Sequence, residues 1–329
     1  MLKYIIKRIL YLIPILVGVL LLLFILSELT PGDAADALLP SDATFEQKEA
    51  WREENGLKDP FLVRFVRYVA GAFTGDLGTS YKTHQPVLKE IMQRLPYSLL
   101  VSFCAVIFGV LIGVPLGVIS AIKAYTWIDN ALIVFSMMML SLPMFCLGLF
   151  SIFIFSVQLN WLPAFGVDTW KGFIMPIGVV ALASSVSYIR VARTTMLEAM
   201  RQDYVMTARA KGQHERIVVF KHMLRNALIP IVAQIGGDIG ANLGGAMILE
   251  TVFGVPGIGK YISDNITARN YPSVLGGVFV LAMMVTIVNL LVDLAYTVVD
   301  PRLKTSIIIT GSIRKSRKLA AKGGVPANG

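Results

Sequence analysis

Long stretches without charge alternate with shorter charged segments along most of the chain. No Asp, Glu, Lys or Arg occurs within residues 9–27, 95–122, 130–167, 172–189 and 270–292. Because a helix needs about 20 apolar residues to cross a bilayer, the pattern predicts spans near 9–29, 97–121, 130–156, 174–193, 227–250 and 274–298. The stretch 130–167 is too long for one helix, so we expect a kink at Pro143 and an interfacial exit at Asn160-Trp161-Leu162-Pro163.

Composition supports this reading. The 329 residues are 55% hydrophobic and 16% charged, with a mean hydropathy of +0.68, whereas soluble domains carry about 25% charged residues. We therefore expect an all-α polytopic membrane protein with six transmembrane helices. The first apolar stretch is longer than a signal-peptide core and has no small-x-small cleavage site before Pro31, so it is expected to be retained.

The distribution of basic residues predicts the orientation. With the N-terminus in the cytoplasm, the inside segments hold 19 Lys and Arg and the outside segments hold 11, so both termini are expected to be cytoplasmic. The net charge of +9 reflects this topology, and no nucleic-acid partner is needed to explain it. The expected parts are an N-terminal transmembrane helix (1–30), an extracytoplasmic segment (31–95), a five-helix core (96–304) with a cytoplasmic loop (194–226), and a basic cytoplasmic tail (305–329).

The segment 31–95 carries helix signals. Thr44 to Gln47 has a capping-box pattern, and Gly56 is placed to end the helix that follows. Asp59-Pro60 predicts an N-cap and a first helical proline. One apolar face is then expected from Phe61, Phe65, Val69 and Phe73. Such a segment either shields the bundle or meets a soluble partner outside the membrane.

The stretch GVPGIGKY, residues 254–261, resembles a phosphate-binding P-loop. A P-loop needs Ser or Thr after its lysine and a buried strand before it, but Tyr261 follows Lys260 and a predicted membrane helix precedes the stretch. The predicted topology also places it outside the cell. We therefore expect a tight turn at the outer mouth, formed by Gly254, Pro256, Gly257 and Gly259.

Residues for bond-making chemistry are sparse. Both cysteines fall inside apolar stretches and the three histidines are scattered. No spacing fits a metal site or a common hydrolase motif. We expect no catalytic residue, metal site or cofactor in this chain.

The cytoplasmic loop is strongly patterned. Asp203 is a predicted N-cap, Tyr204 to Lys211 form about two helical turns, and Gly212 is placed to end them in the left-handed conformation. A second helix is predicted from Ile217, Phe220, Leu224, Leu228 and Ile231. Because so short a helix is not stable alone in water, it either docks on a partner or is part of a connecting loop.

The cytoplasmic loop resembles that of a known family. DYVMTARAKG (203–212) followed by HMLRNALIP (222–230) resembles the cytoplasmic loop of ABC-importer membrane subunits in the oligopeptide, dipeptide and nickel permease branch. The similarity runs from residue 1 to about 304 and is greatest to the first of the two permease subunits. Five further segments agree in order: Thr30-Pro31-Gly32-Asp33, Gly75-Asp76-Leu77-Gly78, Asn160 to Pro163, Glu250-Thr251 with Gly254 to Gly259, and Val299-Asp300-Pro301-Arg302.

The chain departs from the general importer motif. Met206 stands where that motif has Glu, and Arg225 stands where it has Pro. This branch is known for a loosened motif, so the resemblance holds. Asp203 and Glu198 are alternative substitutes for the missing Glu.

The resemblance implies a type I ABC-importer permease with a coupling helix that seats in a groove of a cytoplasmic ATPase. It implies a second homologous permease, two ATPase subunits that bind ATP and magnesium, and an extracytoplasmic substrate-binding protein. ATP-driven closure would alternate the access of the path, in a bacterial or archaeal cytoplasmic membrane. The coupling residues would be Asp203, Tyr204, Thr207, Ala208, Arg209, Ala210, Lys211 and Gly212, with Ala208 on the docking face.

Polar residues inside the predicted spans are candidates for the path. Asp238 and Asn242 lie one turn apart in the fifth helix, and Asn289 and Asp293 form a similar pair in the sixth. Such residues face a bundle interior or water, as a path lining or as a structural hydrogen bond. The glycines of the fifth helix, Gly236, Gly237, Gly240, Gly244 and Gly245, favour close packing against the partner permease.

The substrate class predicted from the resemblance is an oligopeptide or dipeptide, with nickel chelates or glutathione as alternatives. A self-contained channel or ion-coupled transporter would need charged pairs and inverted repeats. The chain shows few intramembrane charges and no obvious repeat. A membrane-embedded enzyme lacks its catalytic constellation.

Overall fold

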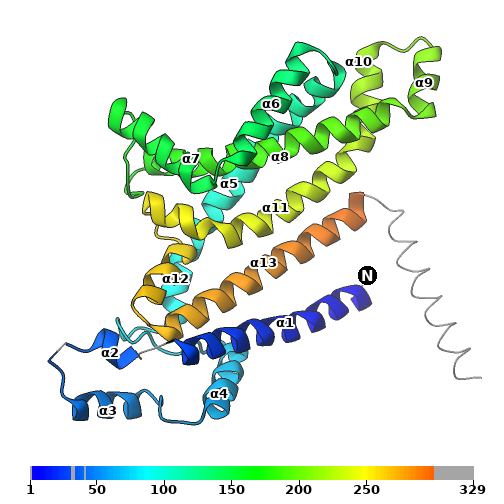
Figure 1. Cartoon of the computed structure of the whole chain (residues 1–329). Coiled ribbons are helices and arrows are strands. Elements are labelled where there is room, and N and C mark those ends of the chain that lie inside the picture. Colours follow the sequence, from blue (N-terminus) through cyan, green and yellow to red (C-terminus); the bar gives the residue numbers. More distant parts are fainter. Residues whose placement is uncertain (1, 31–33, 41, 300–329) are drawn as a thin grey trace, which may run out of the picture.

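The computed structural model describes residues 2–30, 34–40 and 42–299 (Figure 1). The basic tail predicted at 305–329 lies outside the described residues. The helices are α1 (Leu2–Leu29), α2 (Ala34–Leu38), α3 (Phe45–Glu54), α4 (Phe61–Thr74), α5 (Val87–Ile122), α6 (Trp127–Ser141), α7 (Met144–Ser151), α8 (Ile174–Met200), α9 (Asp203–Ala210), α10 (Glu215–Ile217), α11 (Leu224–Phe253), α12 (Ile258–Thr267) and α13 (Tyr271–Val299). Short π-helical segments, Ile152–Gln158 and Val218–Met223, follow α7 and α10, and a 3₁₀ turn, Trp170–Phe173, precedes α8.

Five helices in the described residues are long and apolar enough to cross a membrane: α1, α5, α8, α11 and α13, with their flanking turns. The remaining predicted span, 130–156, is not one straight helix. It consists of α6 and of α7 with its π-helical end, bent by 98°. The kink predicted at Pro143 is thus a complete break, because a residue before proline is disfavoured in the α region and Leu142 is extended, with φ −92° and ψ 126°.

The long helices lie side by side. Figure 1 shows α9 and α10 at one end of them and α2, α3 and α4 at the other. The closest helix pair is α5 with α8, where glycines let the backbones approach. A Cβ on Gly113 would lie 2.5 Å from the carbonyl oxygen of Ser185, and one on Gly117 would lie 2.6 Å from that of Ile189.

The segment after α1 folds against the bundle. The predicted capping box is confirmed, since Thr44 Oγ1 accepts from the amide of Gln47 and Gln47 Oε1 accepts from the amide of Thr44. The predicted turn at Gly56 is also present, with φ +65°. The N-cap predicted at Asp59 is wrong, because α4 begins one residue later, with Pro60 as its N-cap. The Asp59 carboxylate instead pairs with Arg67 at 2.8 Å.

The apolar face predicted on α4 packs on α1 and α13. Phe61 and Phe65 pack against the same buried cluster as Phe24 of α1, and the rings of Phe24 and Phe65 lie 5.4 Å apart. Phe73 meets Phe279 of α13 edge to face at 5.7 Å. This face therefore belongs to the fold itself, which leaves only the outer surface of α4 for a partner.

Candidate functional site

The loop between α8 and α11 forms the short helix that the sequence predicts, displaced by one residue. The N-cap is Gln202, which has extended backbone angles, and not Asp203 as predicted. Asp203 is the first helical residue, where a carboxylate still complements the positive end of the helix. At the other end the prediction is confirmed: Gly212 has φ +72°, and the amide of Gln213 donates to the carbonyl of Ala208 at 3.3 Å.

One side of α9 is built into the chain's own core. Val205 is fully buried and Ala208 is 5% exposed. Both belong to a cluster, called here the α9 cluster, to which α5, α8, the π-helical turn and α11 also contribute. Its members are Val118, Ala121, Met196, Ala199, Val205, Ala208, Val218, Val219, Met223 and Ala227. The prediction that Ala208 lies on the docking face is therefore wrong.

The opposite side of α9 is exposed. Tyr204, Met206, Thr207 and Ala210 are all accessible, and Met206 is 57% exposed. A two-turn helix alone does not show which side it will bury. Val205 and Ala208 are three residues apart and so share one face of α9, but exposed Tyr204 and Thr207 have the same spacing.

The turn after α9 is held by polar contacts. Arg209 binds both carboxylate oxygens of Glu215, with Nη2–Oε1 at 2.6 Å and Nε–Oε2 at 3.2 Å. His222 and Gln213 are hydrogen-bonded at 2.8 Å. These contacts fix the chain reversal at Gly212, so α9 is presented in a defined position, with Lys211 also exposed.

The helix after this turn differs from its predicted pattern. The expected apolar face included Ile217, Phe220 and Leu228, but these three are exposed. The π-helical turn Val218–Met223 takes more residues per turn than an α-helix, which shifts the buried face. The buried residues of this turn and of the start of α11 are Val218, Val219, Met223 and Ala227. Of the predicted face, Ile231 is confirmed as buried, and Leu224 packs against the α9 cluster.

The turn between α11 and α12 contains the stretch that resembles a P-loop. Gly254 ends α11 with φ +68°, and Gly257 precedes α12. The carboxylate of Glu250, which is 1% exposed, accepts from the amide of Lys260 at 2.9 Å and from Ser98 Oγ at 2.6 Å. Helix N-termini hold phosphate through such free amides, and here Glu250 occupies that position.

Two glycines allow this arrangement. A Cβ on Gly257 would collide with the Glu250 carboxylate, and one on Gly259 would lie 2.5 Å from the Cα of Met247. Pro256 is exposed at the tip of the turn. The stretch is thus a compact structural turn built around the buried side chain of Glu250.

We expect Lys260→Ala to leave ATP hydrolysis by an assembled complex unchanged. The Lys260 ammonium pairs with the exposed Asp264 carboxylate at 2.6 Å, and surface pairs of this kind contribute about 0.3–0.5 kcal/mol. Hydrolysis by the purified complex is the measurement. Near-complete loss of hydrolysis at normal assembly would contradict this assignment and restore a phosphate-binding role.

Asp238 and Asn242, the residues predicted to line the translocation path, lie beside a cavity of about 310 Å³. This cavity is called here the Asp238 cavity. Gln234 Nε2 donates to Asp238 Oδ1 at 2.9 Å, and Asn242 Nδ2 donates to Ser184 Oγ at 3.3 Å. The structure thus places Asp238 and Asn242 together. The rest of the lining comes mainly from α8 and the break between α6 and α7: Met139, Leu140, Leu142, Met144, Leu147, Ala183, Ser184, Val186 and Ser187.

The second predicted pair is described only in part, because the side chain of Asp293 lies outside the described residues. A Cβ on Gly240 would lie 2.9 Å from Oδ1 of Asn289, and one on Gly236 would meet Val292. These two glycines therefore serve packing against α13 of the same chain. Gly237, Gly244 and Gly245 have no atom within 4 Å of a built Cβ, so their side of α11 is open.

Comparisons with known proteins identify the family. Residues 113–305 match the family described as the binding-protein-dependent transport system inner membrane component, and residues 1–102 match the N-terminal family of such components. The chain belongs to this family of ABC-importer permeases. The permease is therefore a multi-pass inner-membrane subunit of a transport system.

Relatives match over nearly their whole length. The permease is 36% identical to the dipeptide transport system permease protein DppB of Alkalihalophilus pseudofirmus, covering 92% of this chain and 100% of the relative. It is 37% identical to the glutathione transport system permease protein GsiC of Pectobacterium atrosepticum, covering 92% and 99%. The inward-facing MetNI methionine ABC transporter matches with a TM-score of 0.52 at 18% identity, covering 64% of this chain and 96% of that one, which shows the fold.

The permease also has a partly buried ion pair that was not predicted from the sequence. Asp129, at the first turn of α6, is 1% exposed and binds Arg193 of α8 through two contacts, at 2.7 and 2.8 Å. Ser120 Oγ and the amide of Tyr125 also donate to its carboxylate. The sequence did contain a signal for this pair, because Asp129 and Arg193 carry opposite charges at the cytoplasmic ends predicted for two spans.

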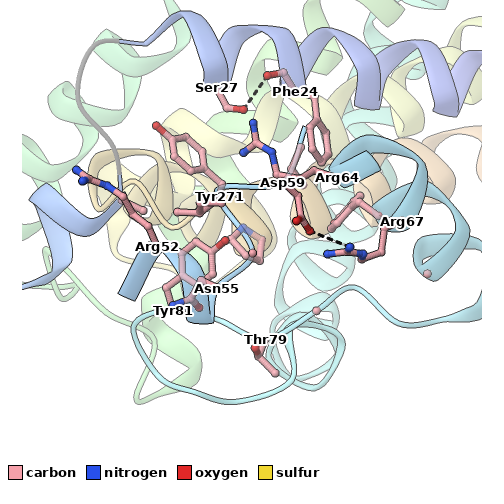
Figure 2. Close-up of a pocket in the computed structure, with 18 of the residues that line it drawn as sticks. Phe24, Ser27, Arg52, Asn55, Asp59, Arg64, Arg67, Thr79, Tyr81 and Tyr271 are labelled. Atoms are coloured by element: carbon pink, nitrogen blue, oxygen red, sulfur yellow. Dashed lines mark hydrogen bonds and ion pairs between the residues drawn. The ribbon is translucent and has the colours of Figure 1, made fainter. Parts of the chain in front are cut away.

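A second feature that was not predicted from the sequence is a cavity of about 860 Å³ between α1, the end of α3, α4 and the start of α13 (Figure 2). Arg64 pairs with Glu28 at 2.5 Å, and Trp51 meets Tyr81 edge to face. Burial raises the pKa of the Tyr81 hydroxyl to about 12, so it stays a neutral group. The three arginines among the described lining residues, Arg52, Arg64 and Arg67, are each paired with a carboxylate.

Proposed function

We propose that this permease forms half of the translocation path of an ABC importer that takes up peptides delivered by an extracytoplasmic binding protein. The observation that carries the proposal is α9, which has one side anchored in the α9 cluster and the other exposed. A helix held in this way presents a rigid surface to a partner. The partner would be a cytoplasmic ATPase that binds ATP and magnesium, so that this chain hydrolyses nothing itself.

The remaining partners follow from the same proposal. A second homologous permease would complete the path, and two ATPase subunits would drive alternating access by rigid-body motion. The outer surface of α4 and the exposed tip at Pro256 would face the binding protein. Figure 1 shows α4 and α12, which follows this turn, away from α9 along the bundle, and this separation supports different partners at the two ends.

The Asp238 cavity supports a peptide as the substrate. Its polar groups, Asp238, Asn242 and Ser184, can hydrogen-bond a peptide backbone or ammonium group. Its other wall contains Met139 and Met144, whose flexible side chains adapt to varied shapes. A path that accepts many peptide side chains needs this combination. Glutathione, itself a small peptide, is the second candidate because a glutathione permease is among the similar relatives.

Uptake by cells tests the proposal. A strain that lacks this gene, with and without a plasmid copy, is given a radiolabelled dipeptide, a labelled pentapeptide and labelled glutathione. We expect the plasmid copy to restore uptake of at least one peptide, and competition among the three to identify the preferred class. Equal uptake of all three with and without the permease would contradict a role in peptide import.

We also propose that α9 and both termini lie in the cytoplasm, on the basis of the Lys and Arg distribution. Single cysteines replace Glu46 and Gln213, both exposed, in a background without Cys104 and Cys146. An impermeant maleimide is expected to label position 46 in intact cells and position 213 only after permeabilisation. The reverse result would invert the topology.

A further inference from the structure

Helix α6 is joined to the rest of the permease by a polar contact at its first turn. Its buried residues are Asp129 and Ser136, and none of its apolar residues is buried. Val134, Met137 and Met138 are each more than half exposed. Among the described residues, the side-chain hydrogen bonds between α6 and its neighbours α5 and α8 come from Asp129, at the first turn of the helix.

That contact joins three helices. The Asp129 carboxylate accepts from Nε and Nη2 of Arg193 on α8, and from the hydroxyl of Ser120 on α5 at 2.5 Å. A bidentate guanidinium–carboxylate pair fixes angle as well as distance. The pair therefore sets the orientation of α6 relative to both neighbours.

The same helices carry the α9 cluster. Ser120 precedes Ala121, and Arg193 lies one turn before Met196, and both of these neighbours belong to that cluster. A displacement of α9 would thus reach the ion pair through rigid, closely packed helices. At its far end α6 contributes Met139 and Leu140 to the wall of the Asp238 cavity.

We propose that Asp129 and Arg193 are positioning residues that transmit motion of α9 to the cavity wall, by making α6 move as one body with α8. The proposal rests on the proposed function, because it assumes that an ATPase moves α9. Without the pair, α6 is free to shift against α8. ATP would still be hydrolysed, but fewer hydrolysis events would be accompanied by opening or closing of the Asp238 cavity.

The test removes the pair without leaving a buried charge. Replacing a buried ion pair by apolar residues of similar size is often neutral for folding, so the main variant is Asp129→Leu with Arg193→Met. We expect normal permease abundance and normal ATPase co-purification, with peptide transported per ATP hydrolysed lower by about tenfold. Ser136→Ala, which alters the other buried residue of α6, is the matched control and is expected to keep the wild-type ratio.

Two further measurements keep the test decisive. Arg193→Lys keeps the charge but loses the bidentate geometry, and it is expected to give an intermediate ratio. Spin labels at Val134 of α6 and Thr194 of α8, both exposed, are expected to give one narrow distance distribution in the isolated wild-type permease and a broad one in the double variant. This spin-label measurement needs no ATPase or peptide.

The possible failures are distinguishable. A wild-type ratio in both the double variant and Arg193→Lys would overturn the positioning role, and so would identical distance distributions. A wild-type complex with no ATP-driven uptake would instead overturn the proposed function. In that case the distance distributions would still decide whether the pair holds α6 on α8.

Discussion

Gly212→Val is expected to leave the permease in the membrane at normal abundance but to reduce peptide uptake by about tenfold or more. Gly212 has φ +72°, and a β-branched residue in that conformation costs about 1–3 kcal/mol. A cost of this size shifts the equilibrium away from the correctly presented loop by roughly fivefold to 150-fold. The substitution acts through backbone strain alone, because a Cβ at Gly212 would meet no atom within 4 Å.

Gly212→Asn is the matched control. Asn adopts the left-handed conformation more readily than other residues with a Cβ, so this variant is expected to keep most of the uptake. The measurements are co-purification of the ATPase and uptake of a labelled peptide, each normalised to permease abundance. Normal uptake with Gly212→Val would mean that the loop does not need its present turn, and the docking role of α9 would be dropped.

Ala208→Glu is expected to have the largest effect on the permease itself. Ala208 is 5% exposed and packs in the α9 cluster, so the new carboxylate would lie among apolar side chains without a partner. An unpaired buried charge costs several kcal/mol. We expect a strong loss of folded permease from the membrane, whatever the state of the ATPase.

Thr207→Glu introduces the same side chain one residue earlier, on the exposed side of α9. This variant is expected to keep permease abundance normal and to weaken ATPase co-purification, since the charge enters the proposed interface. Membrane abundance and co-purification together separate the two effects. Normal abundance with Ala208→Glu, together with loss of the ATPase, would show that Ala208 faces the partner and that α9 is rotated relative to this structure.

The parts of the fold set by local chemistry were predictable from the sequence. Uncharged stretches marked the spans, Gly56 and Gly212 marked helix ends through the left-handed conformation, and Thr44 with Gln47 marked a capping box. Errors at Asp59 and Asp203 were of one residue. Asp203 lies in the first turn of α9, where an aspartate is as favourable as at the N-cap, whereas Asp59 lies one residue before the N-cap of α4.

The features that depend on packing were not predictable in this way. The burial of Ala208 depends on where α5 and α8 end. The change in the buried face of the helix after Gly212 depends on the π-helical turn Val218–Met223, for which the sequence contains no recognisable signal. The partners of Glu250 and Asp129 lie far from them in the sequence, at Ser98 and Arg193. Asp238 and Asn242 could be selected as candidates because a carboxylate inside an apolar stretch is rare. The cavity that they line could not be predicted.

The most direct measurement is transport by the purified complex in proteoliposomes, with ATP enclosed on the side of α9 and the peptide-loaded binding protein added on the other side. The proposed function predicts that labelled peptide accumulates only when ATP, the binding protein and the ATPase subunits are all present. It also predicts that Thr207→Glu abolishes most of this accumulation. Accumulation without ATP, driven by an ion gradient across the same vesicles, would contradict the account and indicate a secondary transporter.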